Sequence, residues 1–185
     1  KLLMNDGCVI IGQHADSTGA PTAVETAYKD GEVVYSVGYN MSMLDVAPDV
    51  ALTSPTSDWS VYYKALFEAE LNGTAVPQDF AAGYDQDGVY ITDLGTACAE
   101  GTQAKVDETI AAIKDGSLKV FDTSTFTVDG QQLTTNKVDF SYINFETNEV
   151  IYKGEEKETV VTEGDKSFFD ESTFRSAPYF SLVID

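Results

Sequence analysis

Short apolar runs alternate with polar stretches at the start of the chain, and this pattern predicts a βαβ unit. Residues 8–12 (CVIIG) form a short run rich in β-branched side chains, which favours a buried strand. Helical spacing follows over residues 21–31, with Pro21 in the first turn and Gly31 after the end. A second apolar run at 32–39 gives the unit the length expected for two parallel strands joined by a helix.

Two longer segments have the three- and four-residue spacing of amphipathic helices. The first covers residues 57–73, with Ser57 or Asp58 as its N-cap and Gly73 at its end. The second covers residues 102–116 and ends in a glycine. Apolar runs between and after these helices predict further short strands at residues 50–54, 88–92 and 117–122.

The pattern changes near residue 123, where short strands separated by turns are expected. Asp129–Gly130 predicts a tight hairpin turn, and residues 138–154 alternate in a way that favours more strand. The polar stretches ETNE and GEEKE (154–158) are interpreted as solvated turns, and a short helical turn is expected around 170–176. At the other end, KLLMNDG has the character of the last turns of a helix, so we expect the chain to be a fragment.

Composition and charge narrow the classes of partner. The chain has 185 residues, 43% of them hydrophobic, which is enough for one globular domain or one large lobe. It has 11 Lys and Arg against 31 Asp and Glu, and the net charge of −20 argues against nucleic acid and anionic membrane surfaces as partners. No apolar run is long enough to span a bilayer, and no signal peptide is visible.

Metal and redox chemistry have little support in the residue pattern. Cys8 and Cys98 are far apart without a CxxC motif, and one histidine cannot complete the usual zinc ligand sets. The two thiols could pair in an oxidising compartment or stay free and buried. Asp85 and Asp87 lie in YDQDGVY, which lacks the EF-hand spacing and is interpreted as a solvated acidic turn. We expect no metal and no cofactor.

The candidate site lies in the loops that follow the predicted strands, at residues 13–20, 39–48 and 54–59. Ligands bind beyond the carboxyl ends of strands in open α/β sheets, so these loops should converge. Their hydroxyl, carboxylate, amide and aromatic groups suit a neutral, polar, flat solute. The candidate ligand-binding residues are His14, Asp16, Ser17, Thr18, Asn40, Ser42, Ser57 and Trp59.

Each of these residues also has a purely structural interpretation. His14 could hydrogen-bond within its own turn, and the polar side chains of residues 16–18 could cap the helix that follows. A cap and a ligand contact can coexist, because helix N-termini present N–H groups to ligands. Asn40 at a strand end could serve the turn, and Trp59 could be part of the core on its helix face.

Several short motifs occur in a specific order over about residues 1–122. The chain runs from CVII through QHADSTG and a helix to VYSVGYN, then through an Ala-Pro-Asp loop to LTS, Trp59 and the Tyr62–Tyr63 pair. This order resembles the basic membrane protein (BMP) family of ABC-transporter substrate-binding lipoproteins, also called the PnrA-like or Med family. Residues 132–165 do not match that pattern, and we interpret them as an insertion.

The resemblance implies one lobe of a bilobal type I periplasmic-binding-protein fold. Such a lobe is a three-layer α/β/α structure with a mostly parallel sheet, here followed by a β-rich C-terminal extension. Residues 1–122 would form the core of the second lobe, and residues 123–185 would cross the hinge and carry the extension.

The resemblance also implies a role in transport without catalysis. The protein would be an extracytoplasmic, membrane-anchored lipoprotein and a monomer that delivers solute to an ABC permease. A purine nucleoside or nucleobase is the expected solute. One departure bears on ribose recognition, because Asn40 stands where nucleoside-binding members often have Asp. Ser42 stands where related sequences have the Asp of a DM pair. Where some members place a Lys after the LTS strand, this chain has Ser57 and Asp58.

Two alternative functions stay open at this point. One is a ligand-binding sensor of the same fold without transport. The other is a hydrolase that uses His14 and Asp16, which the absence of GxSxG, P-loop and GxGxxG motifs argues against.

Overall fold

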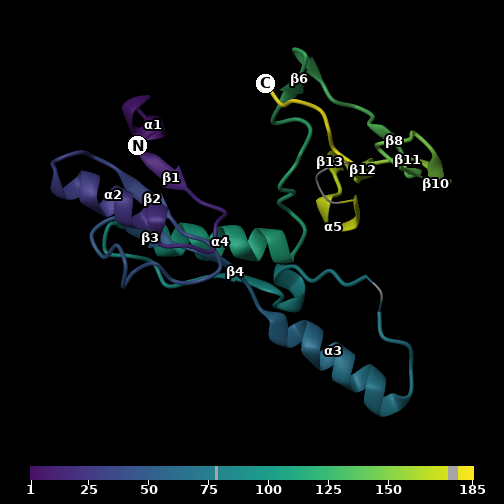
Figure 1. Ribbon diagram of the computed structural model, residues 1–185, viewed down its shortest axis with the longest axis horizontal. Coiled ribbons are helices and arrows are strands. Elements are labelled where there is room, and N and C mark those ends of the chain that lie inside the picture. Colours follow the sequence, from purple (N-terminus) through teal and green to yellow (C-terminus); the bar gives the residue numbers. More distant parts are fainter. Residues whose placement is uncertain (78, 175–178) are drawn as a thin grey trace. The chain divides into compact units, whose positions relative to one another are not determined.

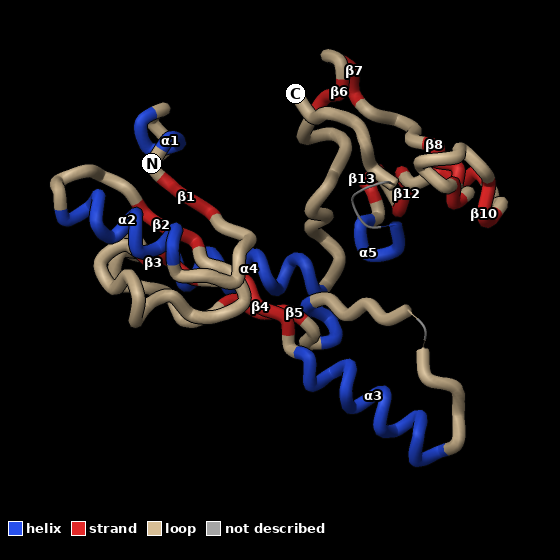
Figure 2. Tube along the Cα trace, viewed as in Figure 1, coloured by secondary structure: helices blue, strands red, loops and turns tan. Residues whose placement is uncertain are grey.

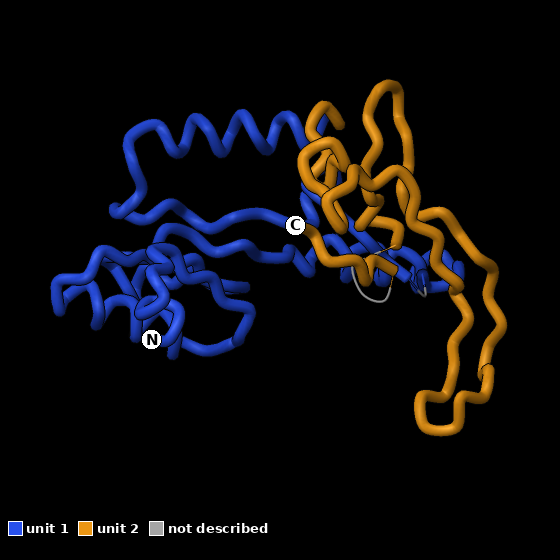
Figure 3. Tube along the Cα trace, turned by 90° about the horizontal axis from the view of Figure 1, so that it is seen from above, with its two compact units in different colours: residues 1–115 blue, residues 116–185 orange. Residues whose placement is uncertain are grey.

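The computed structural model describes residues 1–77, 79–174 and 179–185, and it divides the chain into two compact units. Unit 1 comprises Lys1–Asp115 and unit 2 comprises Gly116–Asp185 (Figure 3). The division falls earlier in the chain than the predicted boundary after residue 122.

Unit 1 is built on a three-stranded parallel sheet in the order β1-β2-β3 (Figure 1). Its strands are β1 (Ile10–Gly12), β2 (Tyr35–Val37) and β3 (Ala51–Thr53), and α2 (Gly19–Lys29) connects the first two. The predicted βαβ unit with parallel strands is therefore confirmed, although each strand is shorter than expected.

The core of unit 1 lies between α2, β2 and β3. It consists of small and medium apolar side chains, and Ser36 of β2 is buried with them. Strand β1 is at the edge of the sheet, and Ile10 is 56% exposed. The prediction of a buried strand at residues 8–12 is wrong for this reason, and Cys8 before it is exposed as well. The core residues are Val24, Ala27, Val34, Met43, Ala47, Val50 and Ala51.

The rest of unit 1 contains two longer helices and an antiparallel strand pair. Asp58 is the N-cap of the first helix, where its carboxylate accepts a hydrogen bond from the Ser60 backbone, and Gly73 ends that helix with a φ of 64°. Both helices lie where the apolar spacing predicted them. The elements are α1 (Leu2–Asn5), β4 (Pro55–Ser57), α3 (Trp59–Asn72), η1 (Tyr84–Gln86), β5 (Val89–Ile91) and α4 (Thr102–Lys114).

The apolar face of α3 has the predicted spacing, but the rest of unit 1 covers it only in part, as where Tyr62 packs on Phe80. Trp59 is 62% exposed and Leu71 is 85% exposed. Of the described residues of α3, only Ala69 is buried. The interpretation of Trp59 as a core residue is therefore wrong in this structure.

Unit 2 consists of short antiparallel strand pairs. The predicted hairpin forms at Asp129–Gly130, where both residues have a positive φ, of 51° and 70°. A short helix, α5 (Glu171–Phe174), is present near the predicted position, and the remainder of the 170–176 prediction lies outside the described residues. The strands are β6 (Thr127–Val128), β7 (Gln131–Gln132), β8 (Lys137–Asp139), β9 (Tyr142–Ile143), β10 (Val150–Tyr152), β11 (Glu156–Glu158), β12 (Val160–Glu163) and β13 (Lys166–Phe169).

Two predictions in this region are wrong. Residues 117–122 do not form a strand, and only a single bridge joins Asp122 to Phe168. The stretch GEEKE is not a turn throughout, because Glu156–Glu158 pairs with β8 along its whole length. Charged side chains are compatible with that strand because all three of its residues are exposed.

The described chain is thus a mixed α/β structure with small sheets. It contains one three-stranded parallel sheet and five two-stranded antiparallel sheets (Figure 2). The β-rich C-terminal region agrees with the prediction. The predicted parallel pairing holds for β1, β2 and β3 only, because the strands after β3 pair antiparallel in small two-stranded sheets.

Candidate functional site

Backbone hydrogen bonds join the three loops at the carboxyl edge of the parallel sheet. The Gln13 N–H donates to the Val37 carbonyl at 3.2 Å, which ties the loop after β1 to the end of β2. The Asn40 N–H donates to the Pro55 carbonyl at 2.8 Å, which ties the loop after β2 to the segment after β3. The first residues of all three predicted loops are therefore neighbours at one edge of the sheet.

An aromatic pair lies on this edge. The rings of His14 and Tyr39 have centroids 4.5 Å apart and an interplanar angle of 35°. His14 is exposed and Tyr39 is half-buried. The candidate set did not include Tyr39, although an aromatic residue at the end of a strand, beside a loop that carries a histidine, was a usable signal.

The polar residues after His14 form an exposed turn that leads into α2. Asp16, Ser17 and Thr18 are all exposed, and the Gln13 amide donates to the Ser17 carbonyl at 3.0 Å. Thr18 occupies the N-cap position, yet no side chain of the described residues caps α2. The first-turn N–H groups of a helix have no partner within the helix, so this turn can bind polar or anionic groups.

Asn40 and Ser42 shape the second loop. Asn40 is exposed and has a φ of 64°, a left-handed conformation that asparagine tolerates better than most residues. Ser42 is exposed, and its hydroxyl accepts a hydrogen bond from the Leu44 N–H at 3.4 Å. Both residues thus serve their turn, which was the structural interpretation of Asn40.

Gly38 lets the second loop approach the segment after β3 closely. A side chain at Gly38 would collide with Ser54 and Met43. Ser54 is completely buried, and among the described residues its hydroxyl has no hydrogen-bond partner. It therefore lies beneath the loops rather than on the face that a solute would contact.

Ser57 and Trp59 lie away from the edge of the parallel sheet where the first two loops meet, because β4 separates them from it. Strand β4 leads from the sheet to α3 (Figure 1), and its length carries Ser57 roughly 10 Å from Ser54. Between them, Asp58 is engaged as the helix cap, and hydrogen bonds from Ser60 lower the pKa of its carboxyl. The arrangement brings His14, Tyr39 and Asn40 together, and Ser57 and Trp59 lie at the far end of β4.

The buried acidic residue Glu25 connects α2 to the loop between β2 and β3. Glu25 of α2 is 5% exposed, and its carboxylate contacts the Lys29 ammonium at 2.8 Å and accepts from the Asp49 N–H at 3.2 Å. Burial raises the pKa of Glu25, but these hydrogen bonds outweigh it, so the pKa lies below its usual range. Glu25 thereby fixes the loop between β2 and β3 against α2.

The acidic turn at Asp85 and Asp87 and the two cysteines have structural roles or are free. Asp87 forms an ion pair with Lys114 at 2.9 Å, and among the described residues no group of three potential metal ligands occurs. Among the described residues the two cysteines form no disulfide, and the Cys98 thiol donates a hydrogen bond to the Leu52 carbonyl. No helix among the described residues has the length and apolar character needed to cross a bilayer.

Comparison with known proteins gives two curated relatives, both of them solute-binding proteins. The chain is 32% identical over 121 residues to a purine-binding protein of Brucella abortus (strain 2308), a match that covers 65% of this chain and 33% of that protein. It is 28% identical over 124 residues to a protein of Haloferax volcanii whose name assigns it as an ABC transporter glucose-binding protein, which covers 67% and 30%. The chain spans about a third of the length of these relatives.

The similarity extends to a solved structure, but not to a specific family. The described chain superposes on the crystal structure of a transcriptional activator of the comK gene from Bacillus halodurans with a TM-score of 0.52 and 14% identity, over 64% of this chain and 41% of that one. At this identity the likeness concerns the fold alone. No known protein-family model matches the chain. The comparisons therefore support a solute-binding protein, and not the BMP family in particular.

Proposed function

We propose that this chain is part of the solute-binding component of an ABC importer, and that its strand-end loops form one wall of the solute site. The observation that carries the proposal is the hydrogen-bonded junction of the three loops, with the His14–Tyr39 pair on it. Similarity to two curated solute-binding proteins supports the same role.

The solute that fits this wall best is a purine nucleobase or nucleoside. Aromatic rings bind flat heterocycles by stacking, and His14 and Tyr39 supply two rings at one place. Asp16 and Asn40 are exposed beside them and offer acceptors and donors for ring nitrogens or hydroxyls. One relative is named for purine binding and the other for glucose binding, so the alternative solute of this proposal is a neutral sugar.

The proposed role is binding without catalysis. A histidine that acts as a general base needs a partner that orients it. His14 contacts the ring of Tyr39, and within the described residues no hydrogen bond joins it to Asp16. In the proposed setting the protein works outside the cytoplasmic membrane, anchored as a lipoprotein, and hands its solute to an ABC permease after hinge closure.

Calorimetric titration of the full-length protein that carries this chain tests the proposal. The titrants are adenine, adenosine, guanosine, inosine and glucose. We expect a purine to bind, and His14→Ala to weaken that binding about fivefold, which is the loss of one stacking contact of roughly 1 kcal/mol. The matched control is Phe145→Ala, which removes an 83% exposed aromatic ring from unit 2.

Three results would count against the proposal. Binding of none of the purines would remove the proposed purine class, and binding of glucose alone would replace it with the sugar alternative. Equal losses in His14→Ala and Phe145→Ala would show that the wall does not contact the solute.

A further inference from the structure

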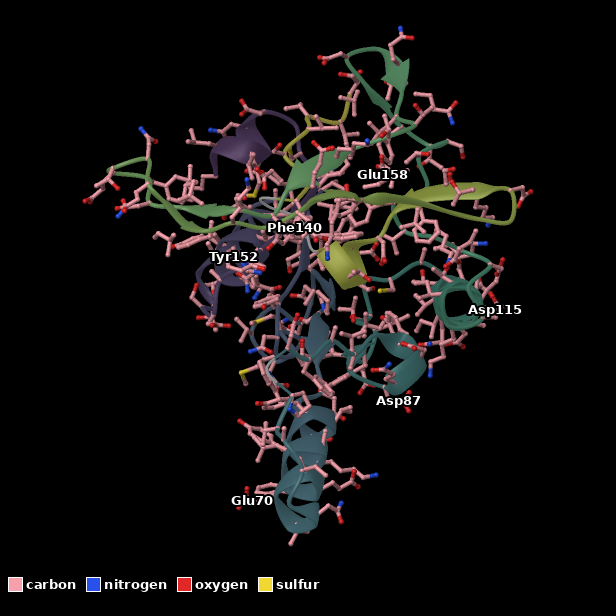
Figure 4. All side chains as sticks on the ribbon, turned by 90° about the vertical axis from the view of Figure 1, so that its right-hand side faces the viewer. Glu70, Asp87, Asp115, Phe140, Tyr152 and Glu158 are labelled. Carbon is pink, nitrogen blue, oxygen red and sulfur yellow. The ribbon has the colours of Figure 1, made fainter. Side chains whose placement is uncertain are left out.

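A polar pocket in unit 2 has a composition unlike the rest of this acidic chain. It has a cavity volume of about 490 Å³ and lies where β8, β10 and β11 meet. Figure 4 labels two of its aromatic residues, Phe140 and Tyr152. The lining consists of Phe140, Tyr152, Lys153, Gly154, Glu155, Lys157 and Tyr179.

Aromatic rings form a fixed wall of this pocket. Phe140 and Tyr179 are stacked, with centroids 4.5 Å apart and planes 11° apart, and Phe174 packs on Phe140 at 5.7 Å. The Tyr179 carbonyl accepts a hydrogen bond from the Asn136 amide, which holds the second ring in place. Tyr152 adds a ring that is 65% exposed and thus accessible to a ligand.

Two lysines give the pocket a local positive charge. The lining carries Lys153, Lys157 and one acid, Glu155, in a chain whose net charge is −20. Among the described residues no carboxylate lies within 4 Å of either ammonium group, although Lys153 contributes to the lowered pKa of Asp139, after the hydrogen bonds from Ser141. The Lys157 ammonium lies 5.4 Å from the centre of the Phe140 ring.

Backbone geometry places these charged groups around the rings. A side chain at Gly154 would collide with the backbone of Phe140, so only glycine allows the link between β10 and β11 to cross the link between β8 and β9 this closely. The Phe140 N–H donates to the Glu155 carbonyl at 3.1 Å, and the Gly154 N–H donates to the Ser141 hydroxyl at 3.0 Å. Lys153 precedes Gly154 in the sequence and Lys157 follows it, and both lysines line the pocket.

We propose that this pocket binds a monosaccharide that carries a carboxylate, such as a uronic acid. The C–H face of a pyranose ring packs on exposed aromatic rings, and a carboxylate pairs with ammonium groups. Glu155 completes the match, because its carboxylate accepts hydrogen bonds from sugar hydroxyls and would repel a ligand that offered only negative charge. This site is separate from the strand-end loops of unit 1 and does not depend on the function proposed for them.

Titration of the whole chain with glucuronate, followed by NMR or calorimetry, tests the pocket. Glucose and benzoate serve as comparison ligands, one without the carboxylate and one without the hydroxyls. We expect both to bind at least about tenfold more weakly than glucuronate, because each lacks one charge-assisted or hydroxyl contact. Adenosine should not compete with glucuronate.

Two substitutions identify the residues responsible. Lys157→Gln should weaken glucuronate binding about tenfold, the effect of one lost charge-assisted contact. Tyr152→Ala should also weaken it, and its ring is exposed enough that the fold should persist. Lys137→Gln is the matched control, because it makes the same change of charge on neighbouring β8 but outside the lining.

Several results would overturn the inference. One is the absence of glucuronate binding at a ligand concentration of about 10 mM, which is high for a specific site. Another is an affinity for glucose or benzoate equal to the affinity for glucuronate. An equal loss of affinity in Lys137→Gln would also overturn it, because binding would then follow only the overall charge.

Discussion

The two units hold their candidate binding surfaces in different ways. In unit 1, parallel strands place the starts of three loops at one edge, and backbone hydrogen bonds from Gln13 and Asn40 connect those loops. In unit 2, the link between β10 and β11 crosses the backbone at Phe140, and the lining comes from three segments, at Phe140, at residues 152–157 and at Tyr179. The first arrangement depends on backbone hydrogen bonds between loops, and the second depends on a close backbone crossing and on stacked aromatic rings.

This difference decides which residues matter for each surface. In unit 1, the loop positions depend on groups behind them, such as Gly38 and the buried Glu25. In unit 2, stacked rings and one glycine crossing at Gly154 define the pocket directly. Substitutions behind the surface should therefore act on unit 1 through stability, whereas those at the crossing should act on the unit 2 pocket itself.

Alanine at Gly38 and Gly154, the close-packed glycines beside the two candidate surfaces, should give large and unequal effects. Gly154→Ala meets backbone atoms of Phe140, which cannot move alone, whereas Gly38→Ala meets the side chains of Ser54 and Met43. We expect both to destabilise their unit by about 1–3 kcal/mol, with Gly154→Ala at the upper end. Hydrogen exchange resolved by unit measures this, and each effect should stay in its own unit.

The control for this pair is Gly12→Ala, whose added side chain would meet no atom within 4 Å. It should leave stability unchanged or slightly higher, because alanine restricts the unfolded chain. Equal effects of Gly12→Ala and Gly38→Ala would contradict the close packing described beneath the unit 1 loops.

Neutralising Glu25 should have a smaller effect that depends on pH. Its pKa is lowered in the folded protein, so the ionised carboxylate stabilises the fold above the unfolded pKa of about 4.3 and that stability is lost as pH falls through the lowered value. Glu25→Gln should cost about 1 kcal/mol at neutral pH, and this cost should shrink as pH falls through the lowered pKa. Urea unfolding at pH 7 and pH 3 measures the difference.

The matched control is Glu108→Gln, which removes an exposed carboxylate that pairs with Lys105. Exposed pairs of this kind contribute about 0–1 kcal/mol, so this variant should be near neutral at both pH values. A larger loss in Glu108→Gln than in Glu25→Gln would contradict the supporting role assigned to Glu25.

Local signals in the sequence predicted elements well, and signals that depend on distant neighbours did not. The Asp129–Gly130 turn and the end of α3 at Gly73 follow from residues close in the chain and were predicted, and the N-cap Asp58 was one of the two predicted alternatives. The exposure of Ile10 depends on what lies beside β1, which an apolar run cannot reveal. The strand at Glu156–Glu158 was missed because its acidic composition is typical of turns.

The candidate site likewise has a part that the sequence could predict and a part that it could not. Convergence of the loops after β1 and β2 could be predicted, because parallel strands end at one edge of a sheet. Tyr39 could have been included for the same reason, but its ring contact with His14 depends on side-chain directions in two separate loops. The placement of Trp59 depends on β4, which was not predicted as a strand and which extends the chain before α3 begins.

NMR observation of His14 tests the central claim most directly, because its ring contacts Tyr39 on the proposed wall, and comparison with His14→Ala assigns its signals in the full-length protein. Adenine or adenosine is titrated into the full-length protein, with Phe145→Ala as the reference variant. A solute on the strand-end loops should shift the His14 ring signals in step with the binding isotherm. Saturable purine binding that leaves those signals unchanged would contradict the account.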